Sequence, residues 1–289
     1  MRYLGAIAAS HTDKMTSQWA THTHHASVVC IAGRRHGLTV ANGKYDNDGN
    51  PDNDGTRSSL VYQNLFVTLT APGESCTVCG GTDAQKADYI KRKMNNNSYL
   101  WDIGAFHKLM RAVQIGGKGD EHTYAAYDEI RKAGGIIATA HEHSYERTWI
   151  LNSFSGCSPY TDTTSSCTVI DNTDPLTIWN EAGGRTGQSF AFVSGAGGAG
   201  NRNQQRCTGS TSNIYGYPYG CNGEWASAMT TDDPTQDYGA FFIEFNVDGD
   251  ARKARAYFKT AKQCSTNTSK WNCGQIWENE PFVIINDAQ

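Results

Sequence analysis

The segment GIIATAHEHSYERT, residues 135–148, places two histidines directly after a short apolar run. An apolar run of this length beside glycines is typical of a buried strand, so His141 and His143 lie where the strand ends and a loop begins. In open α/β sheets, ligand sites gather at the carboxyl ends of strands. Because neutral imidazole is a common ligand of Zn and Fe, the His-x-His pair predicts half of a metal site. The alternative interpretation is a surface loop with two solvated histidines.

A second strand-like run, WDIGAFHK at residues 101–108, also ends in a histidine, His107. Residues 119–134 lie between the two runs and predict a helix, because apolar side chains recur at spacings of three and glycines follow. Strand, helix and strand form a βαβ unit, whose right-handed crossover brings both strand ends to one edge of a sheet. We therefore expect His107, His141 and His143 to converge.

At these positions the chain resembles the calcineurin-like metallophosphoesterases, and in particular their purple acid phosphatase branch. That family carries a strand ending in His, a helix, and Gly-His-x-His followed by Tyr-x-Arg; the matching residues here are His107, His141, His143, Tyr145 and Arg147. Ala140 stands in place of the family's glycine. The resemblance covers roughly residues 56–286. It implies metal-assisted hydrolysis of a phosphate ester, with the three histidines as ligands of Fe, Zn or Mn.

The predicted fold class is mixed α/β, as a partial metallophosphoesterase-like two-sheet sandwich flanked by helices, loop-rich and disulfide-bonded. Apolar and alternating runs predict strands near residues 61–70, 99–106, 135–140, 189–194, 239–247, 252–259 and 281–286. Helices are predicted near residues 83–94 and 121–133, and long loops near residues 152–187 and 199–237. Asp248-Gly249 supplies a hairpin turn between two late strands, so we expect antiparallel pairing in the late part of the chain.

The N-terminal segment departs from the family pattern. The family's first three metal motifs are Asp-x-His, Gly-Asp and Gly-Asn-His, and none of them occurs in residues 1–55. We therefore divide the chain into an atypical segment, residues 1–55, and a metallophosphoesterase-like domain, residues 56–289. Without a bridging carboxylate, three imidazoles suit one ion with open positions for water. Three explanations stay open: a truncated relative, a degenerate one, or a gene-model error before codon 56.

A second cation is expected in an acidic stretch, DNDGNPDNDG at residues 46–55. Its carboxylates, with glycines for tight turns, resemble the calcium-binding loops of extracellular Asp-rich repeats; the candidate Ca²⁺ ligands are Asp46, Asp48, Asp52 and Asp54. The stretch is no EF-hand, because Pro51 occupies the position of the glycine and Arg57 that of the final glutamate. The alternative interpretation is a flexible acidic turn.

The cysteines indicate an extracellular protein or one of the secretory pathway. Eight of the nine fall into close sequence pairs, which predicts local disulfides of open connectivity: Cys76 with Cys79, Cys157 with Cys167, Cys207 with Cys221, and Cys264 with Cys273. Two sequons, at Asn96 and Asn267, mark candidate glycosylation sites. Residues 3–9 fit either a short signal-peptide core or a first strand.

The function expected from these features is a secreted metal-dependent phosphoesterase, with a phosphate ester as its substrate. Arg147 is a candidate phosphate contact or a support of the loop, and Glu142 is expected to face solvent. The alternative is a non-catalytic extracellular binding or structural protein on a decayed phosphoesterase scaffold, stabilised by calcium. The net charge of −4 gives no basic face for nucleic acid, and no apolar run approaches the roughly 18 residues of a membrane span. The sequence predicts no oligomeric state.

Overall fold

The chain forms a mixed α/β fold with two large sheets and few helices. The computed structural model describes residues 3–9, 27–32, 58–62, 64–70, 82–155, 169–197, 200–205, 225–233, 236–260, 276–277 and 280–287. The candidate calcium aspartates, the eight paired cysteines and Asn267 lie outside these ranges. In the described ranges no helix combines the length and the apolar character needed to cross a membrane.

One sheet has six strands, in the order β10-β15-β14-β13-β1-β2. Its strands are β1 (Tyr3–Ala9), β2 (Ser27–Ala32), β10 (Leu176–Ile178), β13 (Gly239–Phe245), β14 (Lys253–Thr260) and β15 (Phe282–Asn286). Pairing is antiparallel except between β10 and β15. The predicted late hairpin is confirmed, because β13 pairs with β14 across a turn in which Asp248 and Gly249 both adopt positive φ.

The other sheet has seven strands, in the order β12-β7-β11-β6-β5-β4-β3. Its strands are β3 (Ser58–Tyr62), β4 (Leu65–Leu69), β5 (Trp101–Ala105), β6 (Ile136–Thr139), β7 (Tyr145–Thr148), β11 (Ala191–Ser194) and β12 (Trp225–Met229). The central strands β4, β5, β6 and β11 are parallel, and β7 runs antiparallel to β11. A small third sheet pairs β8 (Ile150–Leu151) with β9 (Val169–Asp171).

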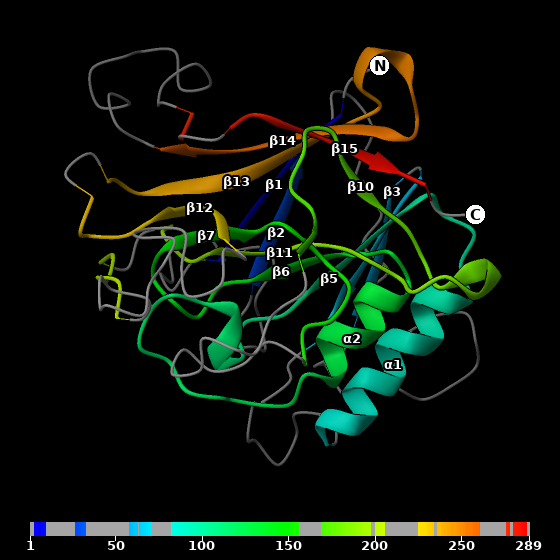
Figure 1. The fold of residues 1–289 in the computed structure, drawn as a ribbon, viewed down its shortest axis with the longest axis horizontal. Helices are drawn as coiled ribbons and strands as arrows, with labels where there is room; N and C mark the ends of the chain where they lie inside the picture. The colour runs from blue at the N-terminus through cyan, green and yellow to red at the C-terminus, as the bar shows by residue number, and fades with distance from the viewer. Residues whose placement is uncertain are drawn as a thin grey trace.

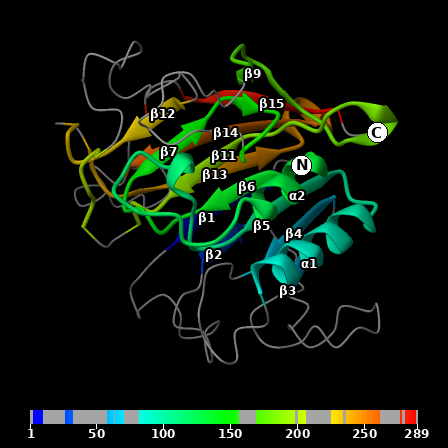
Figure 2. The same cartoon turned by 60° about the horizontal axis from the view of Figure 1, so that its bottom comes forward.

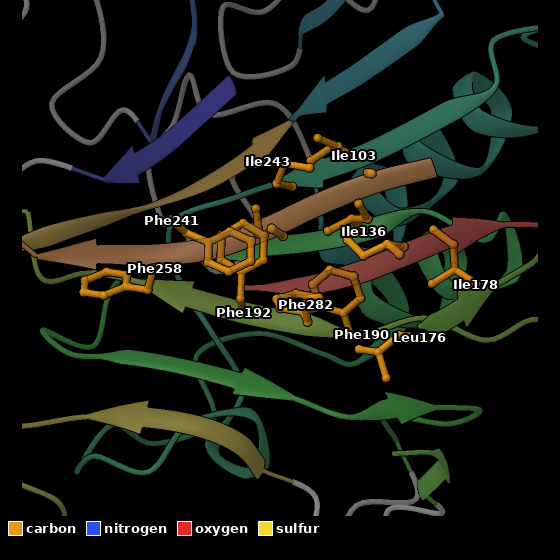
Figure 3. Packing of buried hydrophobic residues seen from close by; sticks show 14 of the residues in the cluster. Ile103, Ile136, Leu176, Ile178, Phe190, Phe192, Phe241, Ile243, Phe258 and Phe282 are labelled. Carbon is orange, nitrogen blue, oxygen red and sulfur yellow. The ribbon is translucent and has the colours of Figure 1, made fainter. Parts of the chain in front are cut away.

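The main hydrophobic core lies between the two large sheets. Both sheets contribute to it, since Ile103 and Ile136 of the seven-stranded sheet belong to the same cluster as Phe241 and Phe258 of the six-stranded sheet. Figure 3 shows side chains from several strands meeting in this layer. The rings of Phe192 and Phe241 stack with centroids 4.2 Å apart, which joins the two sheets directly. Burial of these large side chains holds the sandwich together.

Two α-helices, α1 (Asp83–Asn95) and α2 (Ala125–Lys132), lie side by side on the opposite face of the seven-stranded sheet (Figure 1). Figure 2 shows the same layers turned so that both helices come forward. Three 3₁₀ turns complete the described elements: Arg111–Val113, Ala182–Gly184 and Val247–Gly249. The helices cover β5 and β6 on this face, so both strands are buried on two sides, as is usual for parallel strands.

Local sequence explains where the helices begin and end. At α1, the Thr82 hydroxyl accepts from the Gln85 amide, and the Gln85 side chain accepts from the Thr82 amide, which makes a capping box. At α2, the chain turns at Gly134 with φ of +71°, a conformation that favours glycine. The chain then enters β6 directly. This confirms the predicted helix stop and the predicted order of strand, helix and strand.

Several strands were not predicted. The segment 152–187, expected to be a long loop, contains β9 and β10, and β10 pairs with the distant β15. Strands β7, β8 and β12 were also missed. Residues 3–9 form strand β1, which was one of the two interpretations of this segment. Except for β8 and β9, which pair with each other, the missed strands pair with partners far away in sequence, and a short segment alone does not predict such pairing.

Candidate functional site

Strands β5 and β6 place two of the predicted histidines next to each other. The two strands are parallel neighbours, with Ala105 paired to Ala138 near their carboxyl ends. Beyond the strands, the His107 carbonyl accepts from the backbone amides of Ala140, at 3.3 Å, and His141, at 3.0 Å. Backbone hydrogen bonds therefore hold the two histidines next to each other, independently of any contact between their side chains. The predicted convergence at one sheet edge is correct for this pair.

The two imidazole rings share a hydrogen bond. Nδ1 of His141 lies 2.8 Å from Nε2 of His107, and the ring centroids are 4.6 Å apart. On the other side of the His141 ring, Nε2 lies 2.9 Å from the Glu121 carboxylate. The ionised Glu121 carboxylate accepts from Nε2–H of His141, and the other ring nitrogen, Nδ1, shares a proton with Nε2 of His107. The three groups therefore form a continuous hydrogen-bonded chain.

Glu121 was not singled out from the sequence. Burial alone raises its pKa, but the hydrogen bond and charge of His141, the Leu109 amide and the Lys118 charge together hold that pKa below its ordinary value. The carboxyl group therefore stays ionised at neutral pH and faces the His141 ring. No motif marks this residue, because it lies in a polar loop before α2 and comes to the site only through the fold.

His143 faces another group of residues. Its Nδ1 lies 3.2 Å from the Gly200 carbonyl, and its own carbonyl accepts from the Arg202 amide at 2.8 Å. Burial lowers the pKa of His143, and the positive charge of Arg202 lowers it further. The described contacts thus join His107 with His141, and His143 with the segment at residues 200–202.

Glu142 is buried, which corrects the expectation that it faces solvent. Its Oε1 accepts from the His143 amide at 3.2 Å and lies 3.7 Å from Nη1 of Arg202. Its Oε2 is buried and has no hydrogen-bond partner among the described residues. A Cβ atom added to Gly116 would lie 2.2 Å from the Glu142 carboxyl carbon, so the glycine leaves the space that this side chain fills.

Arg147 lies in the interior. Its side chain is 1 % exposed, its Nε lies 3.0 Å from the Glu280 carboxylate, and its guanidinium carbon lies 3.7 Å from the centre of the Phe282 ring. Tyr145 donates to the same carboxylate at 2.6 Å. These contacts join β7 to residues beside β15 in the opposite sheet. For Arg147 the sequence left two roles open, a phosphate contact or a structural support, and these contacts are those of a structural support.

The histidine pair meets only part of what a metal ion requires. The described residues contain no group of three or more His, Cys, Asp or Glu side chains placed to hold one ion. Two ring nitrogens bound to one tetrahedral ion at about 2.0–2.1 Å would lie roughly 3.3 Å apart. The 2.8 Å between His107 and His141 is a hydrogen-bond distance, with a proton between the nitrogens. As arranged, these residues do not fit a complete metal centre.

One predicted glycosylation site lies within the described ranges. Asn96 is exposed and caps the C-terminus of α1. An exposed asparagine at a helix end is open to modification, and its glycosylation stays a prediction.

Comparisons with known proteins found no sequence match and a partial similarity to two solved structures. No protein-family model matches the sequence, and no curated protein matches it. The structure is similar to a purple acid phosphatase from yellow lupin (Lupinus luteus) seeds, with 12% identity and a TM-score of 0.41, over 80% of this chain and 33% of that one. It is also similar to PhoD, with 8% identity and a TM-score of 0.43, over 84% of this chain and 44% of that one. The chain thus spans less than half the length of either protein.

Proposed function

We propose that this chain is a phosphoester hydrolase. The observation that carries the proposal is the contact between His107 and His141 at the ends of two adjacent parallel strands, with Glu121 behind them. These are the histidines through which the sequence resembles the metallophosphoesterases. The sheet edge on which they lie is the usual place for a ligand site in a parallel α/β sheet.

The chain of Glu121, His141 and His107 is suited to moving a proton. Hydrolysis of a phosphate ester joins a water oxygen to phosphorus, breaks the bond to the ester oxygen, and delivers the water's proton to the leaving alcohol. An imidazole can accept this proton from the attacking water and then donate it to the leaving ester oxygen near neutral pH. Glu121 orients the His141 ring through its contact with Nε2. His107 and His141 are each partly exposed, so one of them can meet a bound ester.

The sequence also predicted Fe, Zn or Mn as an ion held by His107, His141 and His143. Because these residues, as arranged, do not fit a complete metal centre, the proposed hydrolysis has no step through an ion. The proton-transfer role of the histidine pair does not depend on an ion.

We also propose secretion, local disulfides and a calcium site at the acidic stretch of residues 46–55, on the sequence features given above.

The test is turnover of a generic aryl phosphate by the purified full chain, alone and with added Mn²⁺, Zn²⁺ or Fe²⁺. We expect measurable hydrolysis that falls by about 100-fold or more in His141→Ala. The control is His122→Ala, because the ring of His122 packs against Tyr127 and binds the backbone carbonyls of Thr123 and Lys108. Absence of turnover under every condition would favour the non-catalytic alternative.

A further inference from the structure

Two cationic side chains lie beside the histidine loop. Arg202 belongs to the segment at residues 200–205, and Lys118 to the loop that precedes α2. These two segments are packed together, since the Gln205 amide donates to the Ile115 carbonyl at 3.0 Å. A Cβ atom added to Gly117 would lie 2.1 Å from Oε1 of Gln205, which shows how closely the segments approach. Both cations are therefore carried by one connected surface.

The backbone of Arg202 is held at both of its polar groups. Its amide donates to the His143 carbonyl at 2.8 Å, and its carbonyl accepts from the Thr231 amide at 3.0 Å. The side chain is far less constrained: it is 40% exposed, and Nη1 lies 3.7 Å from the buried Glu142 carboxylate. That distance is longer than a hydrogen bond. The guanidinium thus lies near the Glu142 carboxylate and is partly exposed to solvent.

We propose that Arg202 binds the phosphate group of the substrate, with Lys118 as a second cation and Glu142 as the residue that positions the guanidinium. A guanidinium presents a planar fork of N–H donors that matches two phosphate oxygens, while an ammonium adds a point charge. Glu142 reaches Arg202 from inside the protein and so leaves the outer edge of the fork for an anion. This inference rests on the proposed function for the identity of the substrate.

The surrounding charges agree with this role. Lys118 follows two glycines whose positions are known: Gly116 lies against the Glu142 carboxyl group, and Gly117 lies against the Gln205 side chain of the Arg202 segment. Glu142 supplies the opposing negative charge, but its side chain is only 1% exposed and it lies behind the guanidinium. An anion that approaches from solvent meets Arg202 first.

The experiment measures binding of inorganic phosphate to the full chain by titration calorimetry, so it does not depend on turnover. We expect Arg202→Gln to weaken phosphate binding about ten-fold or more, since a charged hydrogen bond is lost, and Arg202→Lys to recover part of the affinity. The matched control is Arg252→Gln. Arg252 is also exposed, at 53%, and also lies 3.6 Å from one carboxylate, that of Asp287.

The positioning role of Glu142 is tested by comparing its substitution with and without Arg202. Glu142→Gln keeps the shape of the side chain and is expected to weaken phosphate binding about three-fold in the wild-type background, and to have no effect when Arg202 is already glutamine. A residue that only supports the loop would weaken binding equally in both backgrounds, and that result would overturn the positioning role.

The two proposals fail in different ways. His141→Ala is expected to abolish hydrolysis while phosphate still binds, whereas Arg202→Gln is expected to raise the KM far more than it lowers kcat. If phosphate binds the wild type and Arg202→Gln equally, or does not bind the wild type at all, the inference about Arg202 is wrong even where hydrolysis occurs. If phosphate binding depends on Arg202 and no ester is hydrolysed, the binding role stands and the proposed function is wrong.

Discussion

His107 and His141 stand one behind the other, joined through Nε2 and Nδ1 at 2.8 Å, and the Glu121 carboxylate closes the chain at 2.9 Å from the far nitrogen of His141. Each of the three side chains comes from a different segment. His107 follows β5, Glu121 precedes α2, and His141 follows β6. The site is therefore assembled by the βαβ unit itself, and changes to that unit are expected to be felt in stability as well as in activity.

Glu121→Gln is expected to flatten the acid side of the stability profile. The lowered pKa of Glu121 means that its ionised form is favoured in the folded protein, so its contribution is complete above the ordinary value of 4.5 and is lost as pH falls below it. The wild type should lose about 0.5–1 kcal/mol more than the variant between pH 6 and pH 3. Urea unfolding at several pH values measures the difference, and parallel profiles would contradict it.

Asp102→Asn is expected to stabilise the protein at alkaline pH. Burial raises the pKa of Asp102 from 3.8 to about 7, against the opposing hydrogen bond from Asn97. The stabilising protonated form is complete below pH 4 and is lost as pH rises through about 7. The charged form of Asp102 lowers the free energy of unfolding by at most about 4 kcal/mol.

Melting temperatures at pH 4 and pH 8 check this prediction. The amide that replaces the Asp102 carboxyl group keeps an oxygen that accepts from Asn97, so the variant should melt higher than the wild type at pH 8 and equally at pH 4. The control is Asp88→Asn, since Asp88 is exposed on α1. A variant that melts lower than the wild type at pH 8 would show that the buried charge is better compensated than the contacts indicate.

Arg147→Met is expected to be severely destabilising. The change leaves the fully buried Glu280 carboxylate without its cation, a loss of about 3–5 kcal/mol. Burial already raises the pKa of Glu280 to about 7 despite Arg147. The loss should therefore be smaller at pH 5 than at pH 8, because protonation removes the unpaired charge.

A second change separates the charge from the packing. Glu280→Gln in the Arg147→Met background should recover much of the lost stability, because no buried charge is left unpaired. Chemical unfolding of the wild type and of the three variants forms a double-mutant cycle. Additive losses would mean that the two side chains stabilise the protein separately.

Gly195→Ala is expected to disrupt the histidine loop. A Cβ atom at residue 195 would lie 1.7 Å from the Glu142 carbonyl oxygen and 2.2 Å from that of Ala140, both backbone atoms that flank His141. We expect a loss of about 1–3 kcal/mol from this overpacking. The same change at Gly200 meets nothing within 4 Å and serves as the control. Equal melting temperatures for the two variants would contradict the prediction.

The parts of the fold that the sequence predicted are those with strong local patterns. Strands β5 and β6, helix α2 and the β13–β14 hairpin have apolar periodicity with clear stops at Gly134 and at the Asp248-Gly249 turn. Strand β7 has the sequence YERT and was missed, since two of its four residues are charged. Its burial depends on β11, β12 and the Glu280 carboxylate, which no local pattern reveals.

The candidate site was predicted in part for the same reason. His107 and His141 follow predicted strands, so their meeting follows from βαβ geometry. Glu121 and Arg202 lie in polar loops without periodicity and reach the site only through tertiary contacts. Glu142 was assigned to solvent because it lies between two predicted ligands in the sequence. The space left by Gly116 was not foreseeable from the sequence around Glu142.

The short turn between β6 and β7 sets a limit on insertions. Tyr145 and Arg147 alternate with Glu146 and Thr148 along β7, and the first two reach Glu280 while Glu146 accepts from Ser144. A shift of β7 by one residue in its register would exchange the two faces of the strand and bring Glu146 toward the aromatic layer. An insertion between the histidines and the tyrosine is therefore tolerated only where the turn absorbs it and β7 keeps its register.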